Sequence, residues 1–370
     1  MTIQKIYLGY WYQRTTLHLS EIYDFLNEGK SPLSLDKGNL KELQGQLNID
    51  SLEYKVDVLE HIDIHATGSI TIKIYEDGLV VLAKDHRAIK QDIEALTEYF
   101  EKRFSPAIKY LFSLGAPVPK ELAGIRDAFP YFIVTSRAKK DDLAKLLESL
   151  SDAKYLDMSA KDVDILRGDE YFVLNPSPAF KNSDGLIEML IFFKEFKAQL
   201  HHYLNLHRII WEEIAEIKEQ RTIRGKDIQT QRNQLESYKK TIELIEGRIN
   251  QMGLYMDTRE NIIKTHGWGE LLTNVLQFKY ANLRHSLDYI KSLWTMTKQY
   301  VDSAIQVFSE INAQSTKNSV QALTVITSLG IVNMILSFLG TKQFPQLTTL
   351  GIYYFILLVV GTWLLNRIIT

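Results

Sequence analysis

The chain has 370 residues, with 43 lysines and arginines against 45 aspartates and glutamates, and a formal charge of −2 that gives no support to a nucleic-acid-binding protein. It has no cysteine, which excludes disulfides, thiolate metal sites and cysteine nucleophiles. Its N-terminal residues show no basic stretch followed by an apolar one, so we expect no cleavable signal peptide and a cytosolic N-terminal part.

Residues 1–183 are predicted to form a cytosolic α/β domain. Seven of the eight prolines lie at or before Pro178, and alternation typical of strands is mixed there with helical spacing. Glu76-Asp77-Gly78 is typical of a hairpin turn. The mixture predicts a central sheet flanked by helices. Strands are predicted at 3–12, 52–65, 69–75, 79–83, 130–136, 153–157 and 171–174, and helices at 17–27, 86–114 and 139–149.

The second half of the chain is predicted to be helical. Residues 184–266 form an antiparallel helical region, with helices at 186–217 and 223–265. Residues 267–319 form a stalk helix, because no proline occurs between 270 and 339. Heptad columns along this segment predict packing against other helices around a bundle axis. The columns are Leu276, Leu283, Ile290, Thr297, Ala304 and Ile311, and Tyr280, Leu287, Trp294, Val301 and Phe308.

Residues 320–370 are predicted to form a transmembrane hairpin with spans at 320–339 and 348–366. Neither segment contains a charged residue, and at about 1.5 Å per residue each can cross about 30 Å of hydrocarbon. The short loop between them places the N-terminal domain and the C-terminus on one side. The predicted fold is therefore an α/β cytosolic domain, a long α-helical stalk and a two-helix transmembrane hairpin.

This order of parts resembles the CorA family of pentameric magnesium channels. Leu323-Thr324-Val325-Ile326-Thr327 is similar to the Leu-Thr-Ile-Ile-Ala run of that family, and Phe344-Pro345-Gln346-Leu347 is similar to its Met-Pro-Glu-Leu loop segment. The family's Gly-Met-Asn signature is replaced here by Gly340-Thr341-Lys342 in the outer loop. A ring of lysines there would repel a divalent cation, which argues against housekeeping magnesium uptake.

CorA-like proteins without that signature are membrane effectors of type III CRISPR systems, and the chain resembles this group. The resemblance implies a homopentameric ion channel or membrane-disrupting effector in antiviral defence. It implies gating by a nucleotide second messenger of the S-adenosylmethionine–AMP (SAM-AMP) type. We expect no enzyme activity, no direct nucleic-acid partner, and a location in the inner (plasma) membrane of a prokaryote, with the N-terminal domain and the C-terminus cytoplasmic. The alternatives are a divalent-cation transporter that handles Mg²⁺ and a membrane-tethered scaffold.

A polar stripe in the first predicted span is the candidate pore lining. Polar side chains in hydrocarbon usually face protein or water, and an amide such as that of Asn333 is costly at mid-depth without a role. The alternative is that small residues only let helices approach closely. The stripe comprises Ser319, Leu323, Thr327, Gly330, Asn333, Met334 and Ser337.

Two further clusters are candidate sites in the N-terminal domain. Tyr10, Trp11 and Arg14 would suit a stacked adenine and an anionic group, although core and edge packing is the more common explanation for such aromatics. His61, Asp63 and His65 alternate along a predicted strand, a spacing that suits a metal ion or a solvent-facing strand. No phosphate-binding glycine loop, nucleophile elbow or carboxylate pair indicates an enzyme, and no cofactor is certain.

Overall fold

The computed structural model describes residues 1–12, 18–57, 59–113, 131–136, 138–160, 162–219 and 225–341, with 353, 356, 357, 360, 361 and 363. Within helices, it describes only the backbone at 225, 226, 315, 319 and 334–341. The chain divides into two compact units. Unit 1 comprises Met1–Leu206 and Leu244–Leu293, and unit 2 comprises His207–Glu243 and Trp294–Thr370.

The centre of unit 1 is one mixed sheet. Within the described residues its strand order is β2-β3-β4-β5-β1-β6-β9-β8-β7. Neighbouring strands pair antiparallel except β6 and β9, which run parallel. The strands are β1 (Thr2–Trp11), β2 (Ile49–Lys55), β3 (His61–Ala66), β4 (Ile70–Tyr75), β5 (Leu79–Asp85), β6 (Tyr131–Ser136), β7 (Leu156–Ala160), β8 (Val163–Arg167) and β9 (Tyr171–Pro176).

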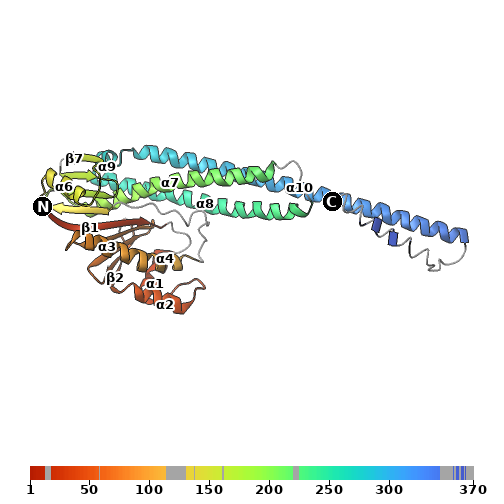
Figure 1. Ribbon diagram of the computed structural model, residues 1–370, viewed down its shortest axis with the longest axis horizontal. Coiled ribbons are helices and arrows are strands. Elements are labelled where there is room, and N and C mark those ends of the chain that lie inside the picture. The colour runs from red at the N-terminus through yellow and green to blue at the C-terminus, as the bar shows by residue number, and fades with distance from the viewer. Residues whose placement is uncertain are drawn as a thin grey trace. The chain divides into compact units, whose positions relative to one another are not determined.

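Helices account for most of the remaining described chain (Figure 1). A short π-helical stretch, Phe100–Phe104, joins α3 to α4. The helices are α1 (Leu19–Glu28), α2 (Lys37–Gln46), α3 (Ile89–Tyr99), α4 (Ser105–Leu111), α6 (Lys140–Ser149), α7 (Ser183–Lys218), α8 (Gly225–His266), α9 (Gly269–Leu276) and α10 (Tyr280–Thr341).

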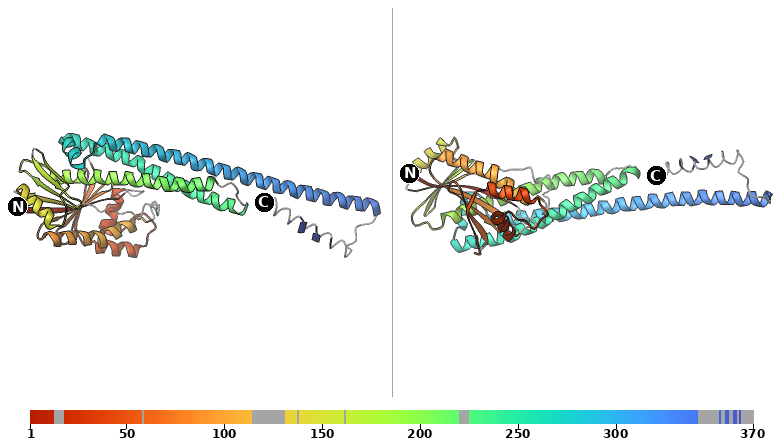
Figure 2. Two further views of the ribbon diagram at one scale, coloured as in Figure 1. Left: turned by 45° about the horizontal axis from the view of Figure 1, so that its top comes forward. Right: turned by 90° about the horizontal axis from the view of Figure 1, so that it is seen from below.

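Strand β1 packs against helices on both of its faces. Since successive side chains of a strand point in opposite directions, neighbouring residues of β1 enter different cores. Ile6 and Leu8 lie in a core with apolar residues of α1 to α4. On the other face Trp11 packs on Phe192 of α7, with ring centroids 5.6 Å apart. Figure 2 shows the sheet with α1 to α4 along one side and the start of α7 along the other. Residues 6–11 of β1 are almost all apolar, as is typical of such a strand, whereas Thr2 and Gln4 at its start are exposed.

Unit 2 contains the end of α7, the start of α8 and most of α10. Trp294, Val301 and Phe308 of α10 are buried, as are Ile214 of α7 and Leu235 of α8. The heptad columns therefore pack largely within one chain, as helix-on-helix packing requires, although Ile311 at the end of one column is 38% exposed. A surface ion pair, Lys239 to Asp302, adds a 2.7 Å contact between α8 and α10.

The predicted two-helix transmembrane hairpin is wrong. Among the described residues, no helix has both the length and the apolar character needed to cross a bilayer. Helix α10 continues without a break from the stalk to Thr341, and polar residues such as Gln321, Thr324 and Ser328 interrupt its apolar end. Most of the predicted second span, 348–366, lies outside the described residues. The α/β domain and the long helical region of the predicted fold are present.

Several element predictions differ from the structure, and helix α2, like strand β8, lies where no element was predicted. The predicted strand 52–65 is two strands, β2 and β3, which pair as a hairpin. Strand β8 was not predicted at all. The predicted helix from 270 onward is divided into α9 and α10 at Gln277, whose φ of 60° is left-handed although no glycine or proline marks the site.

Candidate functional site

A polar cleft of about 720 Å³ opens at one edge of the sheet in unit 1. Its volume lies within the range of about 300–1,000 Å³ that is usual for small-molecule sites. Four stretches of the chain contribute to it: the start of β1, the end of β6, the residues from the end of β7 to the start of β8, and the segment from the end of β9 into α7. The lining residues are Gln4, Ser136, Ala160, Asp162, Val163, Asp164, Asn175, Pro176, Ser177, Pro178, Phe180 and Ser183.

The strand directions explain why these residues meet. Because β6 and β9 are parallel, their carboxyl ends share one edge of the sheet, and Ser136 and Pro176 end them there. Strand β8 is antiparallel to β9, so its first residues, Val163 and Asp164, begin at the same edge. In α/β sheets, ligands bind in crevices outside the carboxyl ends of parallel strands. The cleft occupies such a position.

Hydrogen bonds fix the backbone around the cleft. The amide of Asn175 donates to the carbonyl of Ala138 at 3.1 Å and accepts from the Thr135 hydroxyl at 3.2 Å. The backbone N–H of Ser177 donates to the carbonyl of Asp162 at 2.8 Å, and that of Phe180 donates to the carbonyl of Ser177 at 3.0 Å. These bonds tie the segment after β9 to the residues before β8 and after β6, so the cleft has a preformed wall.

The described lining of the cleft is acidic. Asp162, in the turn before β8, and Asp164, in β8, both line the cleft. The Ser159 hydroxyl donates to Asp164 at 2.5 Å. Among the lining residues that the structure describes, no lysine, arginine or histidine balances the two carboxylates. Arg137 and Lys161, the sequence neighbours of Ser136 and Asp162, lie outside the described residues.

Helix α7 runs from the cleft along the face of the sheet that carries Tyr7 and Trp11. It begins at Ser183, which lines the cleft. One residue later, Asp184 accepts a hydrogen bond from the Tyr7 hydroxyl at 2.7 Å, and one turn later Glu188 accepts one from Lys73 at 3.1 Å. Burial, and then the charge of Asp184, raise the pKa of Tyr7 well above its usual value, so the hydroxyl stays a donor. The first two turns of α7 are thus bonded to β1 and β4.

A fully buried ion pair links the sheet to α8. Arg259 of α8 donates through Nε to Asp77 in the β4–β5 turn at 2.7 Å, and both side chains have no exposed area. Burial acts to lower the pKa of Arg259, but the charge of Asp77 and its hydrogen bond outweigh this and raise it. The guanidinium also lies over the rings of Tyr75 and Phe192, at 4.7 and 5.1 Å. It is therefore held in its charged form.

A second cluster of charges links α8 to α10. Arg284, near the start of α10, pairs with Asp257 and with Glu260 of α8, the latter at 3.2 Å. Asp257 and Glu260 flank Arg259 in the sequence of α8. Ion pairs therefore connect the β4–β5 turn to α8, and α8 to α10, within unit 1.

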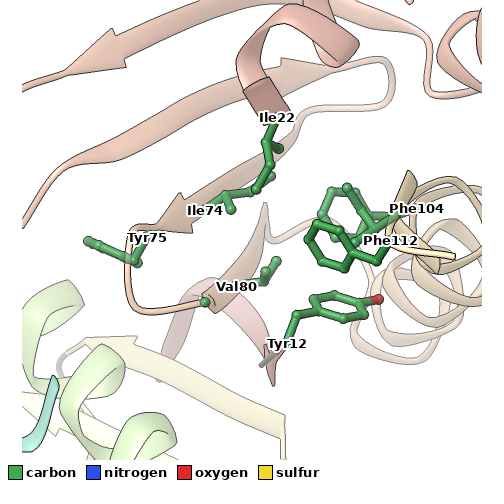
Figure 3. Close-up of a pocket in the computed structure, with 9 residues that line it drawn as sticks. Tyr12, Ile22, Ile74, Tyr75, Val80, Phe104 and Phe112 are labelled. Carbon is green, nitrogen blue, oxygen red and sulfur yellow. The ribbon is translucent and has the colours of Figure 1, made fainter. Parts of the chain in front are cut away.

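The predicted ligand residues lie on different faces of β1. Tyr10 contacts Phe100 on the α1–α4 side, with ring centroids 5.1 Å apart, whereas Trp11 packs on α7. Arg14 lies outside the described residues. Near them a cavity of only about 10 Å³ is lined by Tyr12, Val80 and Phe104 among others, and Figure 3 shows Tyr75 pointing away from it. Such a cavity holds a single water at most.

The predicted pore stripe lies at the end of α10. Leu323, Thr327 and Asn333 are exposed in the single chain, and the Thr327 hydroxyl donates to the carbonyl of Leu323 at 2.6 Å. A Cβ added at Gly330 would have no neighbour within 4 Å. The side chains of the other members, Ser319, Met334 and Ser337, lie outside those that the structure describes, as do those of the predicted outer-loop residues Gly340, Thr341 and Lys342.

The histidine cluster is engaged in pairing within the sheet. His61 is buried and its Nε2 lies 3.6 Å from Asp63, which also pairs with Lys55, whereas His65 is exposed. Across the part of the chain that the structure describes, no group of three or more His, Cys, Asp or Glu side chains could hold a metal ion.

Sequence reasoning missed the cleft. Its residues come from segments as far apart as Gln4 and Ser183, and only the parallel pairing of β6 with β9 brings them together. The one local signal was the run Asn175-Pro176-Ser177-Pro178, which ends a strand with polar residues and prolines. No known protein-family model matches the chain. No curated protein matches it either.

Proposed function

We propose that the chain is a ligand-controlled membrane channel or membrane-disrupting effector that works as a homo-oligomer. A ligand bound in the cleft changes the position of α7 on the sheet, and α10 carries the change to the membrane. The observation that carries the proposal is α10 itself, one 62-residue helix that begins beside the ion pairs of unit 1 and ends in exposed apolar residues.

The exposed end of α10 supports action at a membrane. Six of its large apolar side chains between 320 and 332 are 51% to 65% exposed in the single chain. Contiguous exposed apolar surface marks contact with other proteins or with lipid. In an oligomer some of these side chains face neighbouring copies and others face the membrane surface. The proposed activity needs this apolar surface and does not require a two-helix hairpin. The residues are Val320, Leu323, Val325, Leu329, Ile331 and Val332.

The contacts of unit 1 support transmission from the cleft. The start of α7 is bonded to β1 and β4 through Asp184 and Glu188, and Asp77, Arg259 and Arg284 connect β4–β5, α8 and α10. A ligand shifts a conformational equilibrium only if it binds one arrangement more tightly than the other. A ligand that contacts the start of α7 would bind more tightly to one position of this helix on the sheet than to another, which supplies such a difference in affinity.

The CorA-like resemblance suggests the ligand and the setting. A nucleotide second messenger, the SAM-AMP conjugate, would activate a pentamer in type III CRISPR antiviral defence at the plasma membrane. This part of the proposal rests on the resemblance of residues 323–327 and 344–347 and on the missing Gly-Met-Asn signature.

Dye release from proteoliposomes tests the proposal. Purified chain is reconstituted into vesicles that contain a self-quenched dye and a magnesium indicator. We expect dye release or ion flux only after the SAM-AMP conjugate is added, and none with AMP alone. Magnesium uptake without any ligand would favour the cation transporter. Intact vesicles under every condition would overturn the proposal.

A further inference from the structure

We infer that Glu188 of α7 is a latch with two positions. In the structure it is bonded to the sheet through Lys73 of β4, and in the second position it bonds to guanidinium nitrogens of Arg259 on α8. The exchange couples α7 to α8 when α7 moves. The inference deepens the proposed function by naming the contact that passes the movement on, and only this role rests on that function.

Arg259 has donors that the structure leaves unused. Its Nε donates to Asp77 at 2.7 Å, whereas Nη1 and Nη2 are buried and have no hydrogen-bond partner among the residues that the structure describes. These two nitrogens carry four of the five N–H donors of the guanidinium. Buried donors without an acceptor cost free energy, so a carboxylate that reaches them is bound tightly.

Glu188 is the carboxylate placed to reach them. It is buried, and it accepts hydrogen bonds from Lys73 at 3.1 Å and from the Tyr75 hydroxyl. The ring of Tyr75 lies 4.7 Å from the guanidinium carbon of Arg259, so a single tyrosine side chain contacts both groups. Burial lowers the pKa of Arg259, whereas the charge of Asp77 and, more weakly, that of Glu188 raise it. The Glu188 carboxylate therefore already acts on the guanidinium through its charge.

The exchange leaves no buried charge without a partner. The Lys73 side chain is 37% exposed, so water hydrates its ammonium group once Glu188 leaves it. Arg259 keeps its Nε bond to Asp77 while its Nη nitrogens take Glu188, because the guanidinium donors form a fixed fork. The two positions therefore differ little in charge pairing, as a switch requires.

The second position connects α7 to α10. Arg259 lies between Asp257 and Glu260 in the sequence of α8, and both carboxylates pair with Arg284 of α10. A shift of α7 that brings Glu188 to Arg259 consequently acts on α8 and, through Arg284, on α10.

Urea unfolding of the full chain in detergent, followed by circular dichroism, tests the latch. Lys73→Met releases Glu188 from the sheet. If Glu188 then bonds to Arg259, adding Glu188→Gln removes a buried charged hydrogen bond and should lower the urea midpoint by about 0.5 M or more. If Glu188 does not reach Arg259, Lys73→Met leaves a buried carboxylate unpaired, and adding Glu188→Gln should raise the midpoint instead. A raised or an unchanged midpoint would overturn the inference.

The exposed pair Lys239 and Asp302 is the matched control. Lys239→Met should give the same midpoint with or without Asp302→Asn, because the two side chains are 37% and 44% exposed. If neither Lys73→Met nor its double variant folds, Lys73→Gln, which keeps a neutral donor for Glu188, takes its place. The same direction of the midpoint shift then decides.

Dye release separates the latch from the proposed function. Lys73→Met should lower the concentration of the SAM-AMP conjugate needed for half-maximal release about tenfold, the usual effect of one charged hydrogen bond. An unchanged concentration would overturn the role of the latch in transmission. The expected midpoints without dye release from any protein would instead refute the proposed function and leave the two positions of Glu188 standing.

Discussion

Removing one partner of the buried ion pair should destabilise the protein strongly. Asp77→Ala leaves the Arg259 guanidinium unpaired where its side chain has no exposed area. At 2.7 Å and an effective dielectric constant of about 20, the attraction is about 6 kcal/mol, most of which offsets the cost of desolvation. Leaving one buried charge without its partner costs about 3–5 kcal/mol of unfolding free energy.

Urea unfolding followed by circular dichroism measures this loss. Asp302→Ala is the matched control, because Asp302 and Lys239 are also 2.7 Å apart but 44% and 37% exposed, and such pairs contribute only about 0–1 kcal/mol. The double variant Asp77→Ala/Arg259→Met should lose at least about 2 kcal/mol less than the sum of its single variants, since it leaves no orphaned charge. The reasoning is refuted if Asp77→Ala costs no more than Asp302→Ala.

Three further predictions concern other features. Gly78→Ala should destabilise the protein by more than about 2 kcal/mol, because its Cβ would lie 1.8 Å from the Tyr12 carbonyl oxygen. Gly68→Ala, where the Cβ has open space, should cost only the strain of a positive φ, about 1 kcal/mol. Equal urea midpoints for the two variants would contradict this prediction. Above about pH 10 Tyr7 loses its proton in the unfolded chain but keeps it in the folded one, so the free energy of unfolding should fall as the pH rises. In urea titrations, Tyr7→Phe should reduce this fall by about 1.4 kcal/mol per pH unit. An unchanged pH dependence would argue against the raised pKa of Tyr7. Arg284→Met should reduce ligand-dependent dye release with less than about 1 kcal/mol lost in stability, since this side chain is 37% exposed; full release would show that its ion pairs do not transmit the signal.

Local patterns predicted the strands and turns that depend on neighbouring residues. The predicted strand 3–12 matches β1, and the turn at Glu76-Asp77-Gly78 joins β4 to β5 with Gly78 at φ +88°. Alternation does not show where the chain reverses, so it predicts one strand over residues 52–65, although β2 and β3 pair as a hairpin. A period-two pattern continues equally well through a reversal.

The sequence did not reveal which distant strands pair, and its uncharged segments led to a wrong prediction of membrane spans. The parallel partner of β6 is β9, some 40 residues later, and nothing in either segment specifies that pairing. Because this pairing forms the edge of the sheet where the cleft lies, the cleft could not be predicted either. The uncharged residues 320–339 predicted a membrane span, yet repeated polar positions such as Thr324 and Thr327 lie in the same helix. The break between α9 and α10 falls at Gln277, a residue that marks no helix end in sequence.

Ligand-dependent dye release from vesicles containing either the unmodified chain or Ser136→Trp tests the central claim most directly. The account predicts release by the unmodified chain when the SAM-AMP conjugate is added, and none by Ser136→Trp, whose cleft is filled but whose α10 is unchanged. Equal release by both proteins, or release by the unmodified chain without the conjugate, would contradict control of α10 from the cleft.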